Sequence, residues 1–467
     1  MEISSNPKTF KNVPFYINPK LRDFRNEITY VFNYLGEHLG LAFLESLDKP
    51  KTFYVGYGDD SAPFNISTKF FDDLVLNTEE GIILDTSALA KELNQHSFVY
   101  KGESYIALFI DKEADIFIFE STEKVELRFD LIGAIFFFLS RIEERSNIDL
   151  DRHQRFKLQN TLAYKLKIHD VPVVNYWVDL VSKILDLLLV NMNHKRYIKV
   201  HPTHDVDRLR SYHSLFSELR LAAADVIKGR KSLRKGSRNF LGHLLSKEPE
   251  SSFHYLLDIS EKFLWKSHFF FMASSNYQQD ANYLSTFPDD ARKMVKLIKS
   301  RGHKIGIHPG YYTFNQKELW LKQRNELESF IDQKVISSRQ HVLRWSFPET
   351  LTILEDLGIA EDYSMAFPEG ISFRSGTTYS HYGYHLKNRK SSSVRLYPTP
   401  IMEFALFMDK YINISNEEAF KKVNHCLDQF KKWGGDLTIL FHTVTVMQLR
   451  PQYERLLQLV HDKLVQK

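Results

Sequence analysis

Two carboxylates stand two residues apart in the segment THDVD at 203–207, directly after a strand-like run at 197–200. Alternate side chains of an extended segment point to the same side, so Asp205 and Asp207 share one face. Carboxylates at the end of a buried strand are costly unless they bind a metal or do acid–base work. The alternative is that both cap a helix beginning near Arg208, because Asp favours helix N-termini. We interpret the pair as a chemical site, since two acids with histidines beside them exceed what a helix cap needs.

A histidine ends a second strand-like run, in the segment GHKIGIH at 302–308. The neutral imidazole of His308 is a ligand that zinc accepts. A lone histidine is more often a hydrogen-bonded core residue, but Asp207 is expected on a neighbouring strand end, and we therefore favour metal binding. His303 starts the same run and would lie at its opposite end, so we expect it to be structural.

Two further strand-like runs, at 335–343 and 437–442, carry polar side chains. Arg339 and His341 lie two apart in the first, so we expect them on one strand face, where they would orient a carboxylate and complete a site. Arg339 could instead brace the rim of the fold through a salt bridge. His442 closes the second, nearly apolar run and is our predicted general acid; the alternative is a histidine that caps the strand end through a backbone hydrogen bond.

The second half of the chain alternates strand and helix signals, which is typical of parallel βαβ units. No Gly-x-Gly-x-x-Gly follows any predicted strand, and this argues against a dinucleotide-binding fold. Seven strands in this half favour a barrel related to the (β/α)₈ design, whose working residues sit at the C-terminal ends of the strands. The predicted strands are 197–203, 268–272, 303–307, 335–343, 362–367, 396–402 and 437–442. The predicted helices are 252–265, 286–301, 316–332, 347–357, 415–432 and 448–465.

The first half has a different texture and no catalytic pattern of residues. Short β-like runs at 51–57, 81–85, 104–108 and 115–120 lie between helical signals at 21–44, 129–144 and 174–192. We therefore expect two domains. Residues 1–195 would form a smaller α+β accessory domain that packs against, or caps, a barrel formed by residues 196–467.

Composition excludes several classes of protein. Of 467 residues, 43% are hydrophobic and 26% charged, as is usual for a globular protein, and the net charge of +4 argues against a nucleic-acid binder. The one cysteine, Cys426, rules out an internal disulfide and is expected in the core of a helix. No apolar run reaches membrane-spanning length, and the N-terminus lacks the pattern of a signal peptide. We therefore expect no transmembrane segment and a cytoplasmic location.

A stretch at about 208–252 interrupts the strand–helix alternation. It is rich in basic residues, six of which fall between Lys228 and Arg238. It is either a solvated helix end with a mobile loop, or a lid whose positive charge favours an anionic substrate.

Five short motifs together indicate a family. In chain order they are THDVD at 203–207, GHKIGIH at 302–308, SRQH at 338–341, DYSM at 362–365 and LFH at 440–442. This order resembles the five motifs of polysaccharide deacetylases, and residues 197–465 are similar to a divergent member of carbohydrate esterase family 4, the NodB-homology group. The resemblance implies an α/β fold, a distorted (β/α)7-8 barrel of NodB type preceded by a smaller α+β domain. Residues 1–195 resemble the N-terminal module that accompanies such domains in bacterial surface-polysaccharide loci.

The resemblance also implies a metal site. The family's metal-binding acid matches Asp207 and its first metal histidine matches His308. The second histidine should lie four residues later, where this chain has Tyr312. His341 is a physically sensible substitute because it could face the same mouth of the barrel. The implied cofactor is a divalent metal, with Zn²⁺ the expected ion.

Four residues match the family's catalytic positions. The catalytic base matches Asp205, the arginine that orients it matches Arg339, and the general acid matches His442. Asp362 matches the acid of the fourth motif and is expected to hold the tautomer of His442.

The function that follows is metal-dependent removal of an acetyl group from an N-acetylated or O-acetylated sugar of a surface polysaccharide or its precursor. The expected partner is a carbohydrate substrate, either anionic or lipid-linked. Two alternatives remain open. A non-catalytic carbohydrate-binding or assembly protein would explain Tyr312, and an amidohydrolase acting on a small non-sugar C–N compound would use the same residues.

Overall fold

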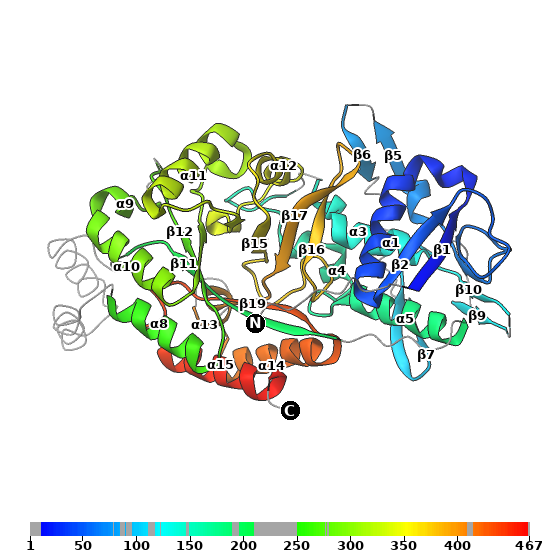
Figure 1. Ribbon diagram of the computed structural model, residues 1–467. Helices are drawn as coiled ribbons and strands as arrows, with labels where there is room; N and C mark the ends of the chain where they lie inside the picture. Colours follow the sequence, from blue (N-terminus) through cyan, green and yellow to red (C-terminus); the bar gives the residue numbers. More distant parts are fainter. Residues whose placement is uncertain are drawn as a thin grey trace.

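The computed structural model describes residues 11–77, 79–84, 89, 96–110, 117–121, 123–145, 149–188, 196–209, 250–275, 277, 280–408 and 414–465. Within these residues the chain forms two large sheets with helices packed around them (Figure 1). The first sheet takes its strands from residues 11–127 and the second from residues 198–440. The mixed α/β class expected from the sequence is confirmed.

The first sheet has six strands in the order β2-β1-β3-β4-β10-β9, and only the β9–β10 pair is antiparallel. Its strands are β1 (Lys11–Ile17), β2 (Leu41–Ser46), β3 (Val55–Tyr57), β4 (Phe64–Ile66), β9 (Ile118–Glu120) and β10 (Val125–Leu127). Two hairpins accompany it, β5 (Leu74–Asn77) with β6 (Gly81–Leu84), and β7 (His96–Tyr100) with β8 (Glu103–Ala107). The helices are α1 (Arg25–Leu39), α3 (Leu131–Ser140), α4 (Leu162–Lys165) and α5 (Val173–Leu188).

The helix predicted at 21–44 is shorter in the structure. It ends because Gly40 adopts φ 66°, a left-handed conformation that glycine tolerates and that turns the chain into β2. Helix α3 is buried on all sides, which its uninterrupted apolar sequence requires. Asp130 begins this helix by accepting hydrogen bonds from the backbone N–H groups of Lys69, Phe70 and Gly133.

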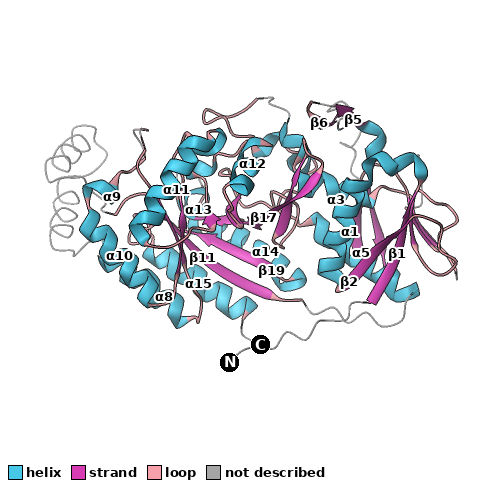
Figure 2. Ribbon diagram, turned by 45° about the horizontal axis from the view of Figure 1, so that its top comes forward, coloured by secondary structure: helices cyan, strands magenta, loops and turns pink. Residues whose placement is uncertain are grey.

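The second sheet has nine strands in the order β16-β17-β15-β14-β13-β12-β11-β19-β18. Its strands are β11 (Ile198–Val206), β12 (His268–Phe271), β13 (Lys304–Ile307), β14 (Ser337–Ser338), β15 (Glu361–Met365), β16 (His381–His385), β17 (Lys390–Pro398), β18 (Ile401–Met402) and β19 (Gly435–Leu440). Its helices are α8 (Glu250–Lys262), α9 (Tyr283–Thr286), α10 (Pro288–Ser300), α11 (Lys317–Ile331), α12 (Glu349–Asp356), α13 (Glu403–Phe407), α14 (Asn416–Trp433) and α15 (Arg450–Leu464). Figure 2 shows α8, α10 and α15 along one side of this sheet.

Every pairing in the second sheet is parallel except that of β16 with β17. The alternation of strand and helix therefore gives the parallel units that the sequence predicts. Closure into a barrel of seven or eight strands is not confirmed, because the described sheet has nine strands and ends at β16 and β18. The predicted strand at 335–343 is also wrong in extent, since only Ser337 and Ser338 pair with neighbours.

The hairpin β16–β17, which the sequence did not indicate, joins the two halves. It forms the edge of the second sheet that faces the helices of the first half (Figure 1). Tyr384 and Leu386 belong to the hydrophobic core of the first half rather than to that of the second. The Tyr384 hydroxyl donates to Glu27 on α1 at 2.5 Å, and Arg389 also pairs with Glu27.

A buried charge cluster makes a second connection between the halves. Glu144 accepts two hydrogen bonds from Arg374, at 2.9 and 2.5 Å, and one from Arg141 at 2.8 Å. All three side chains are at most 4% exposed. Charges this deeply buried are stable only when they are paired and hydrogen-bonded.

Residues 210–249, which include most of the basic insertion, lie outside the described residues. In the part of the chain that the structure does describe, no helix combines the length and apolar character needed to cross a bilayer.

Replacing Glu144 by Ala should lower the free energy of unfolding by about 3–5 kcal/mol, because the buried guanidinium of Arg374 loses its counter-ion and that of Arg141 keeps only Glu143. The measurement is chemical denaturation of the wild type and the variant. Glu417→Ala is the matched control, since Glu417 pairs with Arg455 at 3.0 Å but is 74% exposed, and it should lower the free energy of unfolding far less. Equal losses in the two variants would contradict this role for Glu144.

Candidate metal and acid–base site

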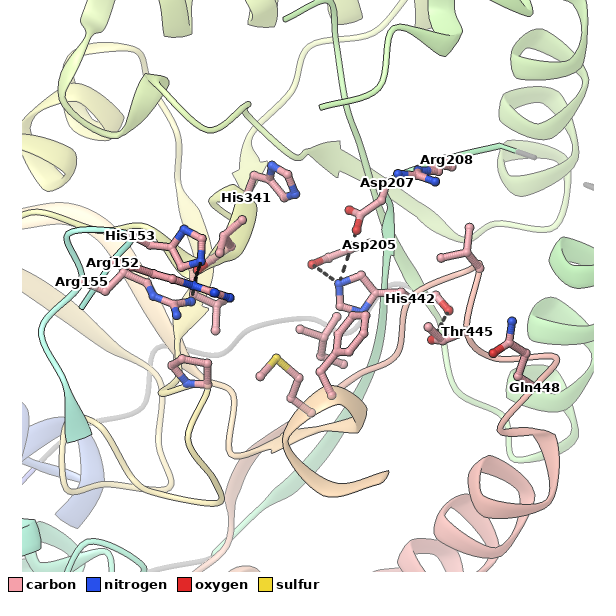
Figure 3. Close-up of a pocket in the computed structure, with 17 residues that line it drawn as sticks. Arg152, His153, Arg155, Asp205, Asp207, Arg208, His341, His442, Thr445 and Gln448 are labelled. Atoms are coloured by element: carbon pink, nitrogen blue, oxygen red, sulfur yellow. Dashed lines mark hydrogen bonds and ion pairs between the residues drawn. The ribbon is translucent and has the colours of Figure 1, made fainter. Parts of the chain in front are cut away.

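The C-terminal ends of the central parallel strands bring the predicted residues together. Asp205 and Asp207 lie at the end of β11, His308 directly follows β13, and Arg339 directly follows β14. His442 stands two residues beyond β19. The ends of parallel strands meet at one edge of a sheet, so residues far apart in the sequence share one site. Figure 3 shows Asp205, Asp207 and His442 facing one another.

Asp205 is held by Arg339. The guanidinium Nη1 donates to Asp205 Oδ1 at 2.9 Å, and both side chains are at most 3% exposed. Arg339 is itself fixed by bonds to the Tyr363 carbonyl and the Thr203 hydroxyl. Burial raises the pKa of Asp205, but Arg339 and the nearby imidazoles outweigh burial and keep that pKa below its ordinary value. Asp205 is therefore an ionised carboxylate whose second oxygen, Oδ2, has no such partner.

Asp207 and His308 present two hydrogen-bond acceptors to each other. His308 Nδ1 lies 2.5 Å from the Arg339 carbonyl oxygen, which can only accept, so this nitrogen carries a proton. In the neutral imidazole the other nitrogen, Nε2, then exposes a lone pair 3.3 Å from Asp207 Oδ1. Both atoms are buried, and neither has a hydrogen-bond partner. This arrangement requires either a proton on Nε2 or a cation between the two atoms.

His341 supplies a third donor atom at the same place. Its Nδ1 lies 2.5 Å from Asp280 Oδ1, so the Asp280 carboxylate accepts a hydrogen bond from Nδ1–H. The other ring nitrogen, Nε2, is then available to bind a cation. One ligand atom each from Asp207, His308 and His341 lie within 4.8 Å of one another. The expected reason for this placement is wrong: His341 and Arg339 do not share a strand face, because β14 ends at Ser338 and His341 begins a 3-10 turn.

The three residues fit a divalent cation. Two imidazoles and one carboxylate, with room for a further ligand, form a donor set that catalytic zinc sites use. Each histidine gives its second ring N–H to an oxygen, His308 to a carbonyl and His341 to the Asp280 carboxylate, as metal-binding histidines ordinarily do. The unpartnered atoms of Asp207 and His308 are those that a cation would satisfy.

Tyr312, where the sequence resemblance leads to the expectation of a second metal histidine, takes no part in this cluster. It is 44% exposed and stands edge-on against the rings of Tyr277 and Tyr311. The segment that carries His341 therefore brings an imidazole to the cluster by another route.

His442 is oriented by Glu403, a residue to which the sequence gave no role. Glu403 Oε1 lies 2.5 Å from His442 Nδ1 and also accepts from the His442 backbone N–H and the Thr445 hydroxyl. Burial lowers the pKa of His442, but the carboxylates of Glu403 and Asp207 outweigh burial and raise it to about 10. His442 Nε2 faces Asp207 Oδ2 at 3.7 Å and Asp205 Oδ2 at 3.9 Å.

Asp362 lies elsewhere, so the expectation that it holds His442 is wrong. It accepts hydrogen bonds from the Ser338 hydroxyl at 2.7 Å and from the Ser364 backbone N–H at 2.8 Å. Burial raises its pKa to about 6 despite these bonds. Asp362 thus braces β14 against β15, directly before Arg339. The strand predicted at 396–402 is wrong in extent, since it merges the end of β17 with β18, which lies at the other edge of the sheet, and Glu403 follows β18.

The site opens into a cavity of about 690 Å³, which is in the size range of small-molecule sites. Arg152, His153 and Arg155, from the first half of the chain, line this cavity together with the site residues (Figure 3). The sequence indicated no catalytic pattern in the first half, and the structure adds that its segment around Arg152 lines this cavity.

That segment also fastens the turn that follows His341. Val342 and Leu343 both have positive φ, at 61° and 55°, which is unfavourable for side-chain-bearing residues and especially for β-branched Val. Arg155 donates to the Val342 carbonyl at 2.6 Å, and Arg344 donates to the His153 carbonyl at 2.9 Å. The first half therefore stabilises the strained turn that places His341.

Comparison with known sequences gives one match. The sequence profile of a family of unknown function, DUF7033, matches residues 18–189. This match covers the first half and brings no activity with it, so the expected link of this half to surface-polysaccharide loci is not confirmed. No curated protein matches the chain.

Comparison with solved structures gives several remote matches. One is described as a polysaccharide deacetylase from Mycobacterium smegmatis, with 14% identity over 60% of this chain and 87% of that chain, at a TM-score of 0.38. Another is a CE4-family pseudoenzyme from Bacillus anthracis, with 11% identity over 57% of this chain and 62% of that chain, at 0.28. A mutant of that pseudoenzyme with restored activity is 11% identical over 57% of this chain and 64% of that chain, at a TM-score of 0.27. This chain covers less than two thirds of the last two, and the functional argument below rests on its own geometry.

Replacing Asp280 by Asn should raise the dissociation constant for Zn²⁺ about 10- to 100-fold, because His341 loses the carboxylate that fixes its tautomer. Calorimetric titration of the metal-free protein with Zn²⁺ measures this. Glu261→Gln is the matched control, since Glu261 pairs with His303 at 3.1 Å and takes no part in the cluster. Unchanged affinity in a folded Asp280→Asn variant would remove His341 from the ligand set.

Proposed function

We propose that this chain is a metal-dependent hydrolase that removes an acetyl group from an N-acetylated or O-acetylated sugar of a cell-surface polysaccharide or its precursor. The observation that carries the proposal is the pairing of an acid with a base in one cavity. Asp205, ionised by Arg339, and His442, protonated beside Glu403, stand 3.9 Å apart and border the cluster of Asp207, His308 and His341. Deacylation needs both groups, one to activate water and the other to protonate the leaving atom.

The cluster would hold the cofactor. A divalent ion bound there, with zinc the best fit to two imidazoles and a carboxylate, would polarise the acyl carbonyl and lower the pKa of water in the site.

Asp205 is the proposed general base. Its Oδ1 is occupied by Arg339, so Oδ2 is the atom that would take the proton from attacking water. Arg339 favours the ionised carboxylate before the proton arrives, and the buried bonds of Arg339 to Thr203 and Tyr363 keep Oδ2 in a fixed position.

His442 is the proposed general acid. His442 Nδ1–H donates a hydrogen bond to Glu403, which directs Nε2–H toward the cavity, where its proton would be delivered to the leaving nitrogen or oxygen. The raised pKa of His442 means that the imidazolium form is present at neutral pH. Glu403 is in this scheme a positioning residue, the role that the sequence analysis gave to Asp362.

An apolar part of the cavity supports an acylated substrate. Met402, Phe404 and Leu440 line the wall on the side of His442, and the Phe404 ring lies 4.5 Å from the imidazole. Such a surface suits the methyl group of an acetyl better than it suits a polar sugar hydroxyl.

Asp205→Asn should lower acetate release by about 10²- to 10⁴-fold, because the amide cannot accept the proton, while the content of bound zinc stays at the wild-type level. The measurements are acetate release from acetylated glycans and elemental analysis of the same sample. Turnover retained at the wild-type rate would remove Asp205 from the role of base. Zinc bound by the wild type without acetate release from glycans, nucleotide sugars or small cyclic amides would favour a non-catalytic binding protein.

Glu403→Gln should lower kcat on the order of 10²-fold while KM changes little, because the amide no longer favours the imidazolium with its Nε2 proton toward the cavity. Steady-state kinetics of acetate release measure this. Asp362→Asn is the comparison, and it should keep the wild-type dependence of kcat on pH because Asp362 does not contact His442. A larger fall of kcat in Asp362→Asn than in Glu403→Gln would reverse the assignment.

A further inference from the structure

The wall of the cavity opposite the acid–base pair is cationic. Figure 3 shows Arg152, His153 and Arg155 together on that wall, across the cavity from Asp205 and His442. All of them line the cavity. Nothing in the hydrolysis of an acetyl group requires these residues, since neither water activation nor protonation of the leaving atom uses them.

Two charged residues of the lining, Arg155 and Asp205, are neutralised by partners outside it. Arg155 pairs with Asp151 at 2.7 Å, and Asp205 pairs with Arg339 at 2.9 Å. These ion pairs hold Arg155 and Asp205 in place and neutralise their charges. Neither residue therefore offers an unpaired charge to a ligand. Arg155 is better described as a support of the Val342 turn than as a binding residue.

Arg152 is different, because within the described ranges no carboxylate pairs with it. Its one polar contact there runs from Nε to His153 Nε2 at 3.1 Å. This bond fixes the plane of the guanidinium and leaves the two terminal nitrogens as a planar fork of donors, the geometry that carboxylate and phosphate groups accept.

A second uncompensated cation borders the metal cluster. Arg208 lines the cavity beside Asp207 (Figure 3), and no acidic residue of the described part of the chain pairs with it. The one carboxylate of the lining without an arginine partner is Asp207, and that residue faces His308, His341 and the place of the cation. The cavity therefore has a surplus of positive charge, which would repel a cationic ligand and attract an anion.

We propose, building on the deacetylase function above, that the substrate is an anionic acylated sugar whose carboxylate or phosphate ester is bound by Arg152. The acyl group would lie at the metal cluster and the anionic group on the wall supplied by the first half of the chain. The accessory half thereby selects the substrate. This role is independent of the basic insertion, most of which lies outside the described residues.

The test is a binding measurement on protein freed of metal by a chelator, so that no phosphate can coordinate a metal and no turnover occurs. The probes are N-acetylglucosamine, its monophosphate ester and its uronic acid, each titrated calorimetrically. Wild-type protein should bind at least one anionic probe about tenfold more tightly than the neutral sugar, the effect expected from one charge-assisted bidentate contact. The two anionic probes distinguish a phosphate from a carboxylate.

Three variants make the result specific. Arg152→Ala should abolish the anionic preference, and Arg152→Lys should keep part of it because the charge remains but the fork is lost. Arg22→Ala removes an exposed arginine that does not line the cavity and should leave the preference unchanged. Equal binding of neutral and anionic probes to the wild type, or a preference that survives Arg152→Ala, would overturn the proposal.

Failure of this proposal can be told apart from failure of the deacetylase function. Acetate release by zinc-loaded protein from neutral and anionic sugars at equal kcat/KM, with no preference in binding, overturns anion recognition and leaves the hydrolase in place. An anionic preference that depends on Arg152, without acetate release from any probe, supports the anion site and overturns the hydrolase.

Discussion

The site depends on two buried atoms that need a positive charge between them. Asp207 Oδ1 and His308 Nε2 face each other at 3.3 Å, and with a neutral imidazole each would present an electron pair. Only positive charge between them makes this burial tolerable. Neighbouring groups fix the proton positions of both histidines. The Arg339 carbonyl accepts a hydrogen bond from His308 Nδ1, and the Asp280 carboxylate accepts one from His341 Nδ1, so that Nε2 of each ring faces the cluster. A cation bound there would lie next to the proposed base, Asp205, and the proposed acid, His442. Arg339 connects the acid–base pair to the cluster of possible metal ligands. Its guanidinium stabilises the ionised form of Asp205, and its backbone carbonyl orients His308.

Sequence reasoning located the strand ends and the residues on them, because apolar runs with polar ends predict parallel strands well. It was therefore able to bring Asp205, His308 and His442 to one edge of a sheet. It misassigned the partner of His442, because the single strand predicted at 396–402 is in fact the end of β17 and the separate strand β18, and Glu403 follows β18, which pairs with β19 at the other edge of the sheet. It also missed Asp280, which belongs to an irregular segment whose path is set by tertiary contacts such as the bond to the Tyr311 backbone N–H. Loops carry no periodic signal, and here they supply much of the second layer of the site.

The two halves of the chain are joined more closely than their separate sheets suggest. One segment of the first half lines the cavity with Arg152 and fastens the strained turn at Val342 through Arg155. A left-handed Val costs about 1–3 kcal/mol and persists only where its surroundings enforce it. The hydrogen bonds of Arg155 to the Val342 carbonyl and of Arg344 to the His153 carbonyl stabilise this conformation. The turn that places His341 beside Asp207 and His308 is thus held by contacts from the first half of the chain.

The hairpin β16–β17 has a consequence for the history of this chain. Its residues Tyr384 and Leu386 complete the core of the first half, although they are encoded some two hundred residues after that half ends. Recombination that exchanged the first half at residue 195 would install a partner unmatched to this hairpin and would leave Glu27 without Tyr384 and Arg389. The halves must therefore be inherited together or change in step. A relative that carries the first half alone would need a substitute for these two side chains.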